Sequence, residues 1–368
     1  MTTLYGRVVT PAGVLDSGVV ELDRGRIVDV AAAADPPWQD AAWILPGFID
    51  LHVHGGGGHT FTTGDPEYAR AAAGFHARHG TTTLLASLVT APLKLLRDAV
   101  LAFTPLVEEG VLAGVHFEGP YLSPGRCGAQ NPAYLRDPDR DELAQLLAAG
   151  PVRMVTIAPE LPGALDAIRH LRDHGILAAI GHTDATYEQT AAGIEAGATI
   201  ATHLFNAMRP LHHRDPGPVA ALLESPAVVC EQIADGVHLH DATLRHVVQF
   251  AGAARVALIT DAMAAAGMPP GAYELGGQEV TVAGGVARLA MDGTIAGSTL
   301  TMDAALRRAV HSGVSIVDAV AMASATPAAV LGLDDRGALV PGRRADVVLL
   351  DDELRVTAVL RGGMRVPS

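Results

Sequence analysis

The amino-acid sequence predicts an α/β protein: a (β/α)8 barrel of the TIM type that carries a small β-sandwich module built from the two ends of the chain. Two observations predict this fold class. Over residues 47–333, aliphatic or β-branched runs alternate with amphipathic stretches rich in Ala, Leu, Glu and Arg, and eight of the runs qualify as strands. At both ends of the chain, short β-like runs separated by turn residues replace this alternation.

The two chain ends, residues 1–46 and 334–368, are expected to form the β-module. Both contain short runs of β-forming residues next to turn residues. The runs are residues 6–9, 18–22 and 26–30 near the start of the chain and residues 345–351 and 357–366 near its end. Because the two ends share this pattern, we expect them to join one module.

The central region, residues 47–333, is expected to form the barrel. The eight candidate strands end near residues 52–54, 85–87, 116–118, 156–158, 180–182, 202–204, 234–236 and 259–261. Helical stretches follow most of them, for example residues 142–149, 165–173 and 188–196. Alternation of this length favours a parallel sheet, and eight units favour a barrel over an open doubly wound sheet. The Gly-rich residues 271–297 predict an inserted hairpin before the final helices.

The composition is that of a globular protein with a negative charge. Of the 368 residues, 49% are hydrophobic and 18% are charged, which excludes a disordered chain. The 26 Lys and Arg residues against 40 Asp and Glu residues give a net charge of −14, which opposes phosphate backbones and anionic membranes. We therefore expect neither nucleic acid nor membrane as a partner. An anionic small substrate would need a local pocket of positive charge.

The cysteines and the start of the chain predict a cytoplasmic protein. Only Cys127 and Cys230 occur, so there is no disulfide framework and no cysteine-based zinc motif. The first residues lack a basic segment followed by an apolar one, and no apolar stretch approaches the length that spans a bilayer.

Ligand-type side chains recur where the predicted strands end. His52 and His54 are two residues apart, so their imidazoles point to the same side of a strand, which suits a zinc-class ion. Alone, this pair is a weak signal. The other strand ends, however, carry Glu118, His182, His203 and Asp261. A barrel places its active-site groups at these positions, and several imidazoles with two carboxylates match a hydrolytic site with one or two metal ions. The alternative is a set of unrelated core or surface residues.

Other motifs give less support to different chemistries. Gly55–Gly58 lacks the Lys and Ser/Thr that follow the glycines of a nucleotide-binding P-loop. No Gly-x-Ser-x-Gly motif occurs, so a serine hydrolase has little support. The histidines in helices and loops, His76 among them, are interpreted as hydrogen-bonded or solvated groups.

Six local motifs together resemble a known family. They are residues 46–55, 116–120, 181–185, 202–208, 235–238 and 260–263. The arrangement resembles the amidohydrolase superfamily and, within it, the N-acetylglucosamine-6-phosphate deacetylase family. The Glu-Gly-Pro and His-Leu-Phe-Asn-Ala-Met segments are the most discriminating. With the terminal module, the resemblance covers essentially the whole chain.

The resemblance implies a divalent metal cofactor. Glu118, His182 and His203 match the ligands of the principal ion in the family. In some members the His-x-His positions are replaced and only one ion binds, whereas His52 and His54 are intact here, so a second ion bridged by Glu118 is expected. Zinc is the first choice, with iron, cobalt or manganese as alternatives.

The resemblance also implies the catalytic residue and the substrate contacts. Asp261 would be the general base that takes a proton from water and delivers it to the departing amine; the alternative is a structural or purely ligating role. The substrate would be held by the backbone amides of Asn206 and Ala207, by Arg214 and by His238. The counterpart of Arg214 reaches the pocket of a neighbouring subunit, which implies a homodimer. Gln130 stands where some relatives have His, so its contact with sugar hydroxyls or the acetyl carbonyl is open.

The expected reaction is hydrolysis of N-acetylglucosamine 6-phosphate to glucosamine 6-phosphate and acetate, in amino-sugar catabolism and recycling. Two alternatives remain at this stage. One is an amidohydrolase that acts on another N-acyl or cyclic amide substrate. The other is a catalytically silent sugar-phosphate binding protein on the same fold.

Overall fold

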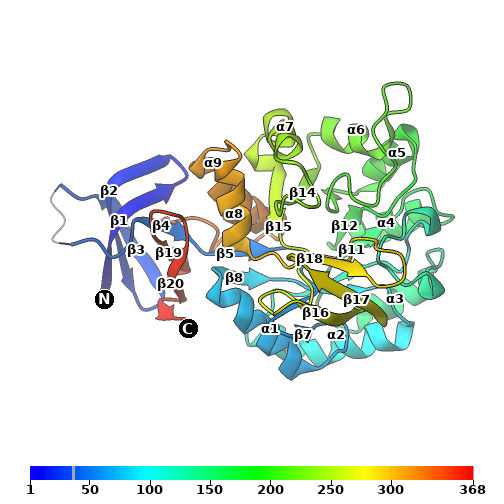
Figure 1. The fold of residues 1–368 in the computed structure, drawn as a ribbon, viewed down its shortest axis with the longest axis horizontal. Helices are drawn as coiled ribbons and strands as arrows, with labels where there is room; N and C mark the ends of the chain where they lie inside the picture. Colours follow the sequence, from blue (N-terminus) through cyan, green and yellow to red (C-terminus); the bar gives the residue numbers. More distant parts are fainter. Residues whose placement is uncertain (35–37, 368) are drawn as a thin grey trace.

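The computed structural model describes residues 1–34 and 38–367, and it has two parts (Figure 1). The part on the left of Figure 1 is a seven-stranded sheet with the order β21-β20-β19-β4-β1-β2-β3. Its strands are β1 (Thr2–Thr10), β2 (Gly13–Asp23), β3 (Arg26–Ala32), β4 (Trp43–Pro46), β19 (Val347–Leu350), β20 (Val356–Arg361) and β21 (Met364–Arg365). Strands from both ends of the chain, which the sequence predicts to join, therefore lie in one sheet.

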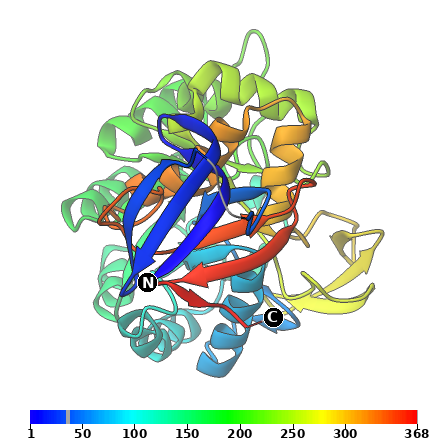
Figure 2. The same cartoon turned by 90° about the vertical axis from the view of Figure 1, so that its left-hand side faces the viewer.

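Strands from the two chain ends meet in the middle of this sheet. Strand β4 pairs in parallel with β1 and antiparallel with β19, so segments about 300 residues apart in the chain are hydrogen-bonded neighbours. Their apolar faces share one core, to which Leu4, Val20, Ile44 and Val347 contribute. Figure 2 looks at this part from its outer side, with both termini on it.

The larger part is built on a curled, parallel sheet. Its strands are β5 (Phe48–Asp50), β8 (Thr81–Leu84), β9 (Ala86–Val89), β10 (Val115–Glu118), β11 (Val152–Ile157), β12 (Leu177–Ile180), β13 (Ile200–Ala201), β14 (Val229–Ile233) and β15 (Val256–Ile259). Strands β9 to β15 pair in sequence order, and β5 pairs with β8. Beyond the strands, the Asp261 N–H donates to the His52 carbonyl at 2.9 Å, and the His54 N–H donates to the Ala262 carbonyl at 2.8 Å. Hydrogen bonds therefore link the segments that follow β5 and β15.

Helices cover the outer face of the curled sheet (Figure 1). They are α1 (Pro66–Arg78), α2 (Leu93–Glu108), α3 (Arg140–Ala148), α4 (Ala164–Asp173), α5 (Tyr187–Ala196), α6 (Gly217–Glu224), α7 (Asp241–Ala251), α8 (Met302–His311), α9 (Ile316–Val320) and α10 (Thr326–Val330). Helix α4 buries Ala164, Ala167, Ile168 and Leu171, which is the spacing of one helix face. Helix α5 begins with a capping box between Thr186 and Gln189. The three helices named from the sequence are confirmed.

The segment after β15 forms a small antiparallel sheet of three strands, β16 (Gly271–Leu275), β17 (Gln278–Ala283) and β18 (Val286–Leu289). It has one strand more than the predicted hairpin. Its apolar face packs with Met263 and Val89, next to the ends of β15 and β9. This sheet therefore stands over the ends of the parallel strands.

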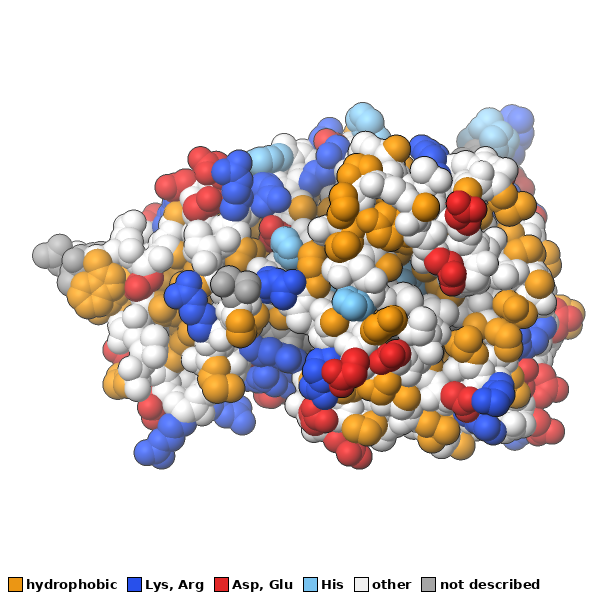
Figure 3. All heavy atoms as spheres, turned by 60° about the horizontal axis from the view of Figure 1, so that its bottom comes forward, with side chains coloured by type: hydrophobic (Ala, Val, Ile, Leu, Met, Phe, Trp, Pro, Cys, Tyr) orange, Lys and Arg blue, Asp and Glu red, His pale blue; other side chains and the backbone are white. Residues whose placement is uncertain are grey.

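The surface of the protein carries charged side chains of both signs (Figure 3). On the face drawn in Figure 3, acidic and basic side chains are interspersed. Among the described residues, no helix is both long enough and apolar enough to cross a membrane. Cys127 and Cys230 are both free thiols.

Candidate metal centre and active site

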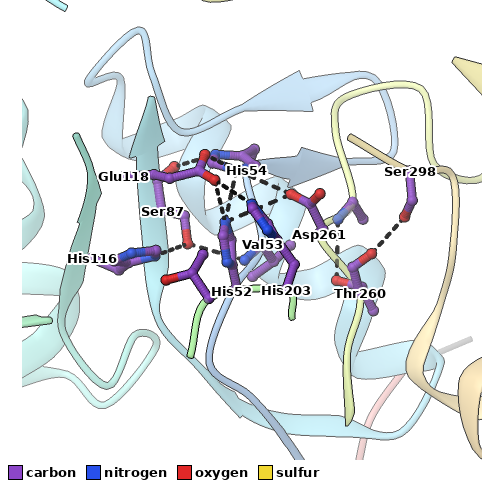
Figure 4. A network of polar contacts seen from close by, with 12 residues as sticks. His52, Val53, His54, Ser87, His116, Glu118, His203, Thr260, Asp261 and Ser298 are labelled. Atoms are coloured by element: carbon purple, nitrogen blue, oxygen red, sulfur yellow. Dashed lines mark hydrogen bonds and ion pairs between the residues drawn. The ribbon is translucent and has the colours of Figure 1, made fainter. Parts of the chain in front are cut away.

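The six ligand-type residues predicted at the strand ends come together at the carboxyl ends of the parallel strands. Figure 4 shows His52, His54, Glu118, His203 and Asp261 directed toward one another. They form two groups of three buried side chains, and within each group the ligand atoms all lie within 4.8 Å of one another. The first ligand group is Glu118, His182 and His203; the second ligand group is His52, His54 and Asp261. Residues from five strand ends thus meet because parallel strands end at the same edge of a sheet.

In the first ligand group, the carboxylate faces two imidazoles. Glu118 ends β10, and its Oε1 lies 2.9 Å from Nε2 of His182 and 2.9 Å from Nε2 of His203. These two nitrogens are 3.2 Å apart. Three donor atoms on one side of a cavity, with space on the other side, are the arrangement of a catalytic metal site.

In the second ligand group, two imidazoles face the carboxylate of Asp261. Nε2 of His52 and Nε2 of His54 lie 3.1 Å apart, and Oδ1 of Asp261 lies 3.2 Å from the latter nitrogen. The other oxygen of Glu118, Oε2, lies 3.1 Å from Nε2 of His54. Oε1 of Glu118, besides its contacts in the first group, lies 3.5 Å from Nε2 of His52. The Glu118 carboxylate therefore stands between the two groups and contacts both.

Three of these residues have an unusual backbone conformation. The φ angles of His182, His203 and Asp261 are +48°, +26° and +49°, in the left-handed region that non-glycine residues rarely adopt. Each is the second residue after the end of its strand, so the chain turns there and the side chain is directed toward the site. Backbone strain of this kind concentrates at functional sites, where the surrounding structure enforces it.

Most of the imidazoles are held through the ring nitrogen that faces away from the site. Nδ1 of His54 lies 3.1 Å from the Ser87 carbonyl oxygen, and Nδ1 of His182 lies 2.9 Å from the Arg126 carbonyl oxygen. A carbonyl oxygen only accepts, so each Nδ1 carries a proton, and Nε2 is the nitrogen left to bind a metal ion in place of a second proton. This tautomer is the one that binds a metal ion through Nε2.

The electrostatics of the site favour positive charge. Burial would raise the pKa of Glu118, but His52 and the hydrogen bonds of His182 and His203 hold it well below its usual range. Burial would lower the pKa of His54, but hydrogen bonds to Asp261 and Glu118 raise it to about 9. Burial likewise raises the pKa of Asp261, and its hydrogen bond with His54 and the nearby His52 bring it below its usual value. The cluster thus attracts cations, whether protons or a metal ion.

The donor set fits a divalent metal ion of the zinc class. It consists of imidazole nitrogens and carboxylate oxygens, with no thiolate, and their spacing permits two neighbouring ions that share Glu118. The ligand atoms of both groups face mainly one another. Few other protein groups would therefore compete with a metal ion for these atoms. The metal dependence implied by the sequence therefore agrees with the residues present.

A polar network supports the site from inside the curled sheet. The Ser87 hydroxyl lies 2.9 Å from Nδ1 of His116, whose Nε2 lies 2.9 Å from the Thr156 hydroxyl. Burial raises the pKa of Asp50 to about 7, despite hydrogen bonds from Thr260 and the His52 amide that lower it. Sequence reasoning did not find Ser87, His116 or Asp50 as parts of the site, because a polar residue within an apolar strand was the only local signal.

A cavity of about 370 Å³ opens onto both ligand groups. It is lined by His54, Glu118, Arg126, Gln130, His182, His203, Asn206, Ala207, His238, Asp261, Leu275, Ile295 and Gly297, among others. Leu275 and Ile295 come from the inserted sheet and the loop that follows it, so this insertion forms part of the cavity wall. The cavity is large enough for a small molecule such as a monosaccharide derivative.

Gln130 makes two hydrogen bonds at the edge of this cavity. Its Nε2 donates to Oε2 of Glu118 at 2.5 Å, and its Oε1 accepts from the Thr90 N–H at 2.8 Å. The Thr90 amide fixes which end of the side-chain amide faces Glu118. Gln130 therefore orients the Glu118 carboxylate, a role that the sequence did not indicate.

Of the other residues predicted to bind the substrate, Asn206, Ala207 and His238 line the cavity. His238 is held by Asp235, whose Oδ2 lies 2.7 Å from Nδ1, and this hydrogen bond raises the pKa of His238 against the effect of burial. The Asn206 N–H already donates to the His203 carbonyl at 2.9 Å. Of the two predicted backbone amides, the one without a hydrogen-bond acceptor among residues 1–34 and 38–367 is therefore that of Ala207. Of the two backbone amides predicted to hold an anion, one is thus occupied.

Arg214 lies outside the cavity of its own chain. It is exposed in the loop between β13 and α6, where its Nη1 lies 2.7 Å from Nε2 of His213. The cationic group that does line the cavity is Arg126, whose Nε donates to Oδ1 of Asp184 at 2.8 Å. Sequence reasoning missed Arg126, although it lies in the same Gly-rich segment as Cys127 and Gln130.

Comparison with known proteins identifies the class of protein that this fold and site define. A profile of the amidohydrolase family matches residues 43–366. The chain therefore belongs to the amidohydrolase family, whose members are metal-dependent hydrolases.

Curated relatives of the chain are deacetylases of amino-sugar phosphates. The chain is 41% identical to the N-acetylgalactosamine-6-phosphate deacetylase of Escherichia coli O157:H7 over 366 residues, which is 96% of each protein. It is 35% identical to the N-acetylglucosamine-6-phosphate deacetylase of Lysinibacillus sphaericus over 368 residues, 97% of this chain and 95% of that protein.

A solved structure of a related enzyme has the same fold. A mutant N-acetyl-D-glucosamine-6-phosphate deacetylase from Mycobacterium smegmatis, in complex with N-acetyl-D-glucosamine-6-phosphate, superposes with a TM-score of 0.96. It is 47% identical in sequence, and the match covers 100% of this chain and 99% of that chain. The resemblance inferred from the sequence motifs is confirmed.

Proposed function

We propose that this protein is a metal-dependent deacetylase that hydrolyses N-acetylglucosamine 6-phosphate to glucosamine 6-phosphate and acetate. The observation that carries this proposal is the cavity itself. Five of the six ligand-type side chains line one wall of it, with His52 buried behind them, and Arg126 and His238 line another. An amide bond held near the ligands and a phosphate held by the cations would use both walls at once.

Glu118, His182 and His203 would hold the principal ion, and His52, His54 and Asp261 a second one beside it. When bound, a divalent ion supplies Lewis acidity, which polarises a carbonyl group and lowers the pKa of water. Gln130 keeps the Glu118 carboxylate in place, and its second amide hydrogen is available to the acetyl oxygen of the substrate.

Asp261 would move the proton. Its carboxylate is ionised at neutral pH and lines the cavity, as a general base must. It takes one proton from the attacking water as the oxygen bonds to the acetyl carbon, and it delivers that proton to the sugar nitrogen as the carbon–nitrogen bond breaks. The immediate products are a free amine and acetic acid, which keeps the second proton of the water; acetic acid then releases that proton to the solvent or to the amine and becomes acetate.

The phosphate would lie against His238, Arg126 and the free Ala207 amide, with the Asn206 side chain close by. Charge-assisted hydrogen bonds of this kind give both affinity and orientation. Arg214 is supplied in this proposal by a second copy of the chain, because its own cavity lies out of its reach, and the protein is then a homodimer. Mixing an Arg214→Ala chain with an Asp261→Asn chain tests this: activity that recovers in the mixture supports exchange of Arg214 between subunits.

The galacto epimer is the second candidate substrate. The relative from E. coli O157:H7 that carries the N-acetylgalactosamine-6-phosphate name is 41% identical to this chain, more than the 35% of the L. sphaericus enzyme. The 47% identity to the M. smegmatis enzyme favours the gluco epimer. Measuring kcat/KM for both phosphorylated epimers separates them.

The decisive experiment compares amine release from N-acetylglucosamine 6-phosphate with that from unphosphorylated N-acetylglucosamine, using metal-replete protein. A preference of about a hundredfold or more, which is about 2.7 kcal/mol, is the expected result. Weak, equal rates would instead support an amidohydrolase with another N-acyl or cyclic amide substrate. No turnover of either sugar would support a silent sugar-phosphate binding protein.

We also infer the finer features of the fold and setting. The curled sheet is interpreted as a closed (β/α)8 barrel, supported by the hydrogen bonds that link the segments after β5 and β15. The division into a sandwich-like module of residues 1–46 and 334–368 and a catalytic unit of residues 47–333 is supported by the membership of the two sheets. Zinc as the ion is supported by the nitrogen and oxygen ligands. A reducing, cytoplasmic setting agrees with two free thiols.

A further inference from the structure

A buried carboxylate that the proposed reaction does not use lies directly behind the second ligand group. Glu231 belongs to β14 and is fully buried. Its Oε2 lies 3.2 Å from Nδ1 of His52, on the side of that imidazole away from the site. The opposite nitrogen, Nε2 of His52, lies 3.1 Å from Nε2 of His54 and 3.6 Å from Oδ1 of Asp261. His52 is therefore held between Glu231 and the ligand atoms.

This support differs from that of the other ligand imidazoles. His54 and His182 donate Nδ1–H to neutral backbone carbonyls, of Ser87 and Arg126. Nδ1 of His203 is buried without a hydrogen-bond partner in the described part of the chain. Only His52 has a carboxylate behind it, and a carboxylate makes an imidazole more basic and fixes its orientation more strongly than a neutral acceptor does.

The position of Glu231 is set by the sheet. The Leu204 N–H donates to the Glu231 carbonyl at 3.0 Å, which fixes the end of β13 against β14. The same Oε2 that faces His52 also accepts from the backbone N–H of His203 at 3.2 Å. Glu231 thus contacts one residue of each ligand group, but it reaches a metal-binding imidazole only through His52.

A carboxylate in this position needs a compensating charge. Its other oxygen, Oε1, is buried and has no partner in residues 1–34 and 38–367, and no Lys or Arg side chain bonds to it. A buried, incompletely bonded carboxylate is costly unless a positive charge lies near it. A cation bound to Nε2 of His52 would polarise that imidazole toward Glu231 and offset the cost.

We propose that Glu231 is the positioning residue of the second ligand group: it holds His52 with Nδ1 protonated and Nε2 directed into the site, and so enables His52, His54 and Asp261 to bind a second divalent ion. Its effect acts through His52, and the ion held by Glu118, His182 and His203 does not depend on it. The proposal rests on the proposed metal ligands and is independent of which sugar phosphate is the substrate.

The test is Zn²⁺ binding to the metal-free full-length protein, measured by titration against a competing chelator and by metal analysis. The wild-type chain is expected to bind two ions, and His52→Ala should bind one, which identifies the second ion. Glu231→Gln keeps the shape of the side chain and should lower the affinity for the second ion by about 10- to 100-fold, while the affinity for the first ion is unchanged. Gln232→Met, which changes the next buried side chain on β14, is the matched control and should bind both ions like the wild type.

A double variant separates the two contacts of Glu231. In the His52→Ala background, Glu231→Gln should have no further effect on the remaining ion. If Glu231→Gln weakened binding of the first ion as much as that of the second, Glu231 would act through the backbone of His203, and the proposal would be overturned. A wild-type chain that binds a single ion would also overturn it, as would unchanged binding of both ions by Glu231→Gln.

A second substitution covers the case in which Glu231→Gln does not fold. Glu231→Asp keeps the charge but withdraws it by one methylene group. It should lower the affinity for the second ion only, and by a smaller factor than Glu231→Gln does. Binding of both ions at wild-type affinity by Glu231→Asp would also overturn the proposal. Because each readout is ion binding, failure here is distinguishable from failure of the proposed deacetylation, which is measured by turnover.

Discussion

The two ligand groups share one carboxylate but are supported in different ways. All three members of the first ligand group line the cavity, and their imidazoles rely on the backbone or on no partner at all. In the second ligand group, His52 lies behind the cavity, fully buried, with the carboxylate of Glu231 at its back. The whole first group therefore faces the cavity, whereas the second group has one member, His52, that depends on the interior of the sheet. The predictions below test this difference, beginning with the largest expected effect.

Glu118→Gln should abolish metal binding by both ligand groups at once. Glu118 has one oxygen toward His182 and His203 and the other toward His54, so loss of its charge removes the ligand that the two groups share. We expect the protein to retain almost no metal and kcat/KM to fall by about 10⁴-fold or more. Metal analysis and turnover check this, with Glu279→Gln, an exposed carboxylate on β17, as the control. A variant with both ions and a tenth of the activity would contradict the shared role.

Asp261→Asn should separate proton transfer from metal binding. The amide keeps the size of the side chain but cannot accept a proton at neutral pH, so kcat should fall by about 10²- to 10⁴-fold. The ion of the first ligand group should remain, because Asp261 is not one of its members. Metal content and kcat are measured on the same sample; near-normal kcat would remove Asp261 from the role of general base.

His238→Gln should affect the substrate and neither ligand group. The hydrogen bond with Asp235 raises the pKa of His238 and so favours its charged form, which the amide of glutamine cannot adopt. For the phosphorylated sugar, kcat/KM should fall by about 10- to 100-fold, the equivalent of one charge-assisted hydrogen bond, and metal content should not change. The unphosphorylated sugar should be processed as before. An equal loss for both sugars would show that His238 does not contact the phosphate, and His311→Gln serves as the control.

His52→Asn should remove the second ion only. The first ligand group and Asp261 remain, so we expect one ion per chain and a fall in kcat/KM of about tenfold, or about 1.4 kcal/mol. Metal analysis together with kinetics provides the check. Loss of both ions would mean that the two groups bind metal as one unit, and the comparison drawn above would fail.

His76→Gln should leave activity at neutral pH almost unchanged and alter the pH dependence of stability. His76 is buried, its Nε2 lies 2.9 Å from the Gly55 carbonyl oxygen next to His54, and burial lowers its pKa to about 4. As the pH falls below about 6.5, the unfolded chain gains a proton at this residue while the folded chain does not until about pH 4, so stability falls across that window. This contribution reaches about 3 kcal/mol.

The variant tests that contribution because glutamine can donate the same hydrogen bond and does not titrate. Between pH 6.5 and 4, the free energy of unfolding of His76→Gln should fall by about 3 kcal/mol less than that of the wild type. Chemical denaturation of metal-free samples in matched buffers measures the difference. Parallel curves for the two proteins would mean that His76 is not held neutral by the fold.

Several parts of the site were predictable because they depend on local pattern. The alternation of strand and helix placed Glu118, His182, His203 and Asp261 at strand ends, where parallel strands bring side chains together. The spacing of His52 and His54 fixed their common side. These predictions need only the period of the chain and the chemistry of each residue type.

Other parts were not predictable from the local pattern. Arg214 has the charge that a phosphate needs, yet it lies outside the cavity of its own chain, while Arg126 lines it. The Asn206 amide has the right position, but a turn with His203 occupies it. Whether a group is available depends on what surrounds it after folding, and a sequence pattern does not contain that information.

By itself, the sequence determined the mixed α/β architecture, the joining of the two chain ends in one sheet and which ligand-type residues end the parallel strands, because these follow from hydrophobic periodicity and from the residue types at the strand ends. The tertiary structure decided how the ligands divide into two groups, that Gln130 and Glu231 orient them, and that Arg126 reaches the cavity. Glu231 and His52 are 179 positions apart in the chain. Their contact exists only because the sheet curls until β14 and the end of β5 face each other, and curvature of that kind is a property of the whole sheet rather than of any segment.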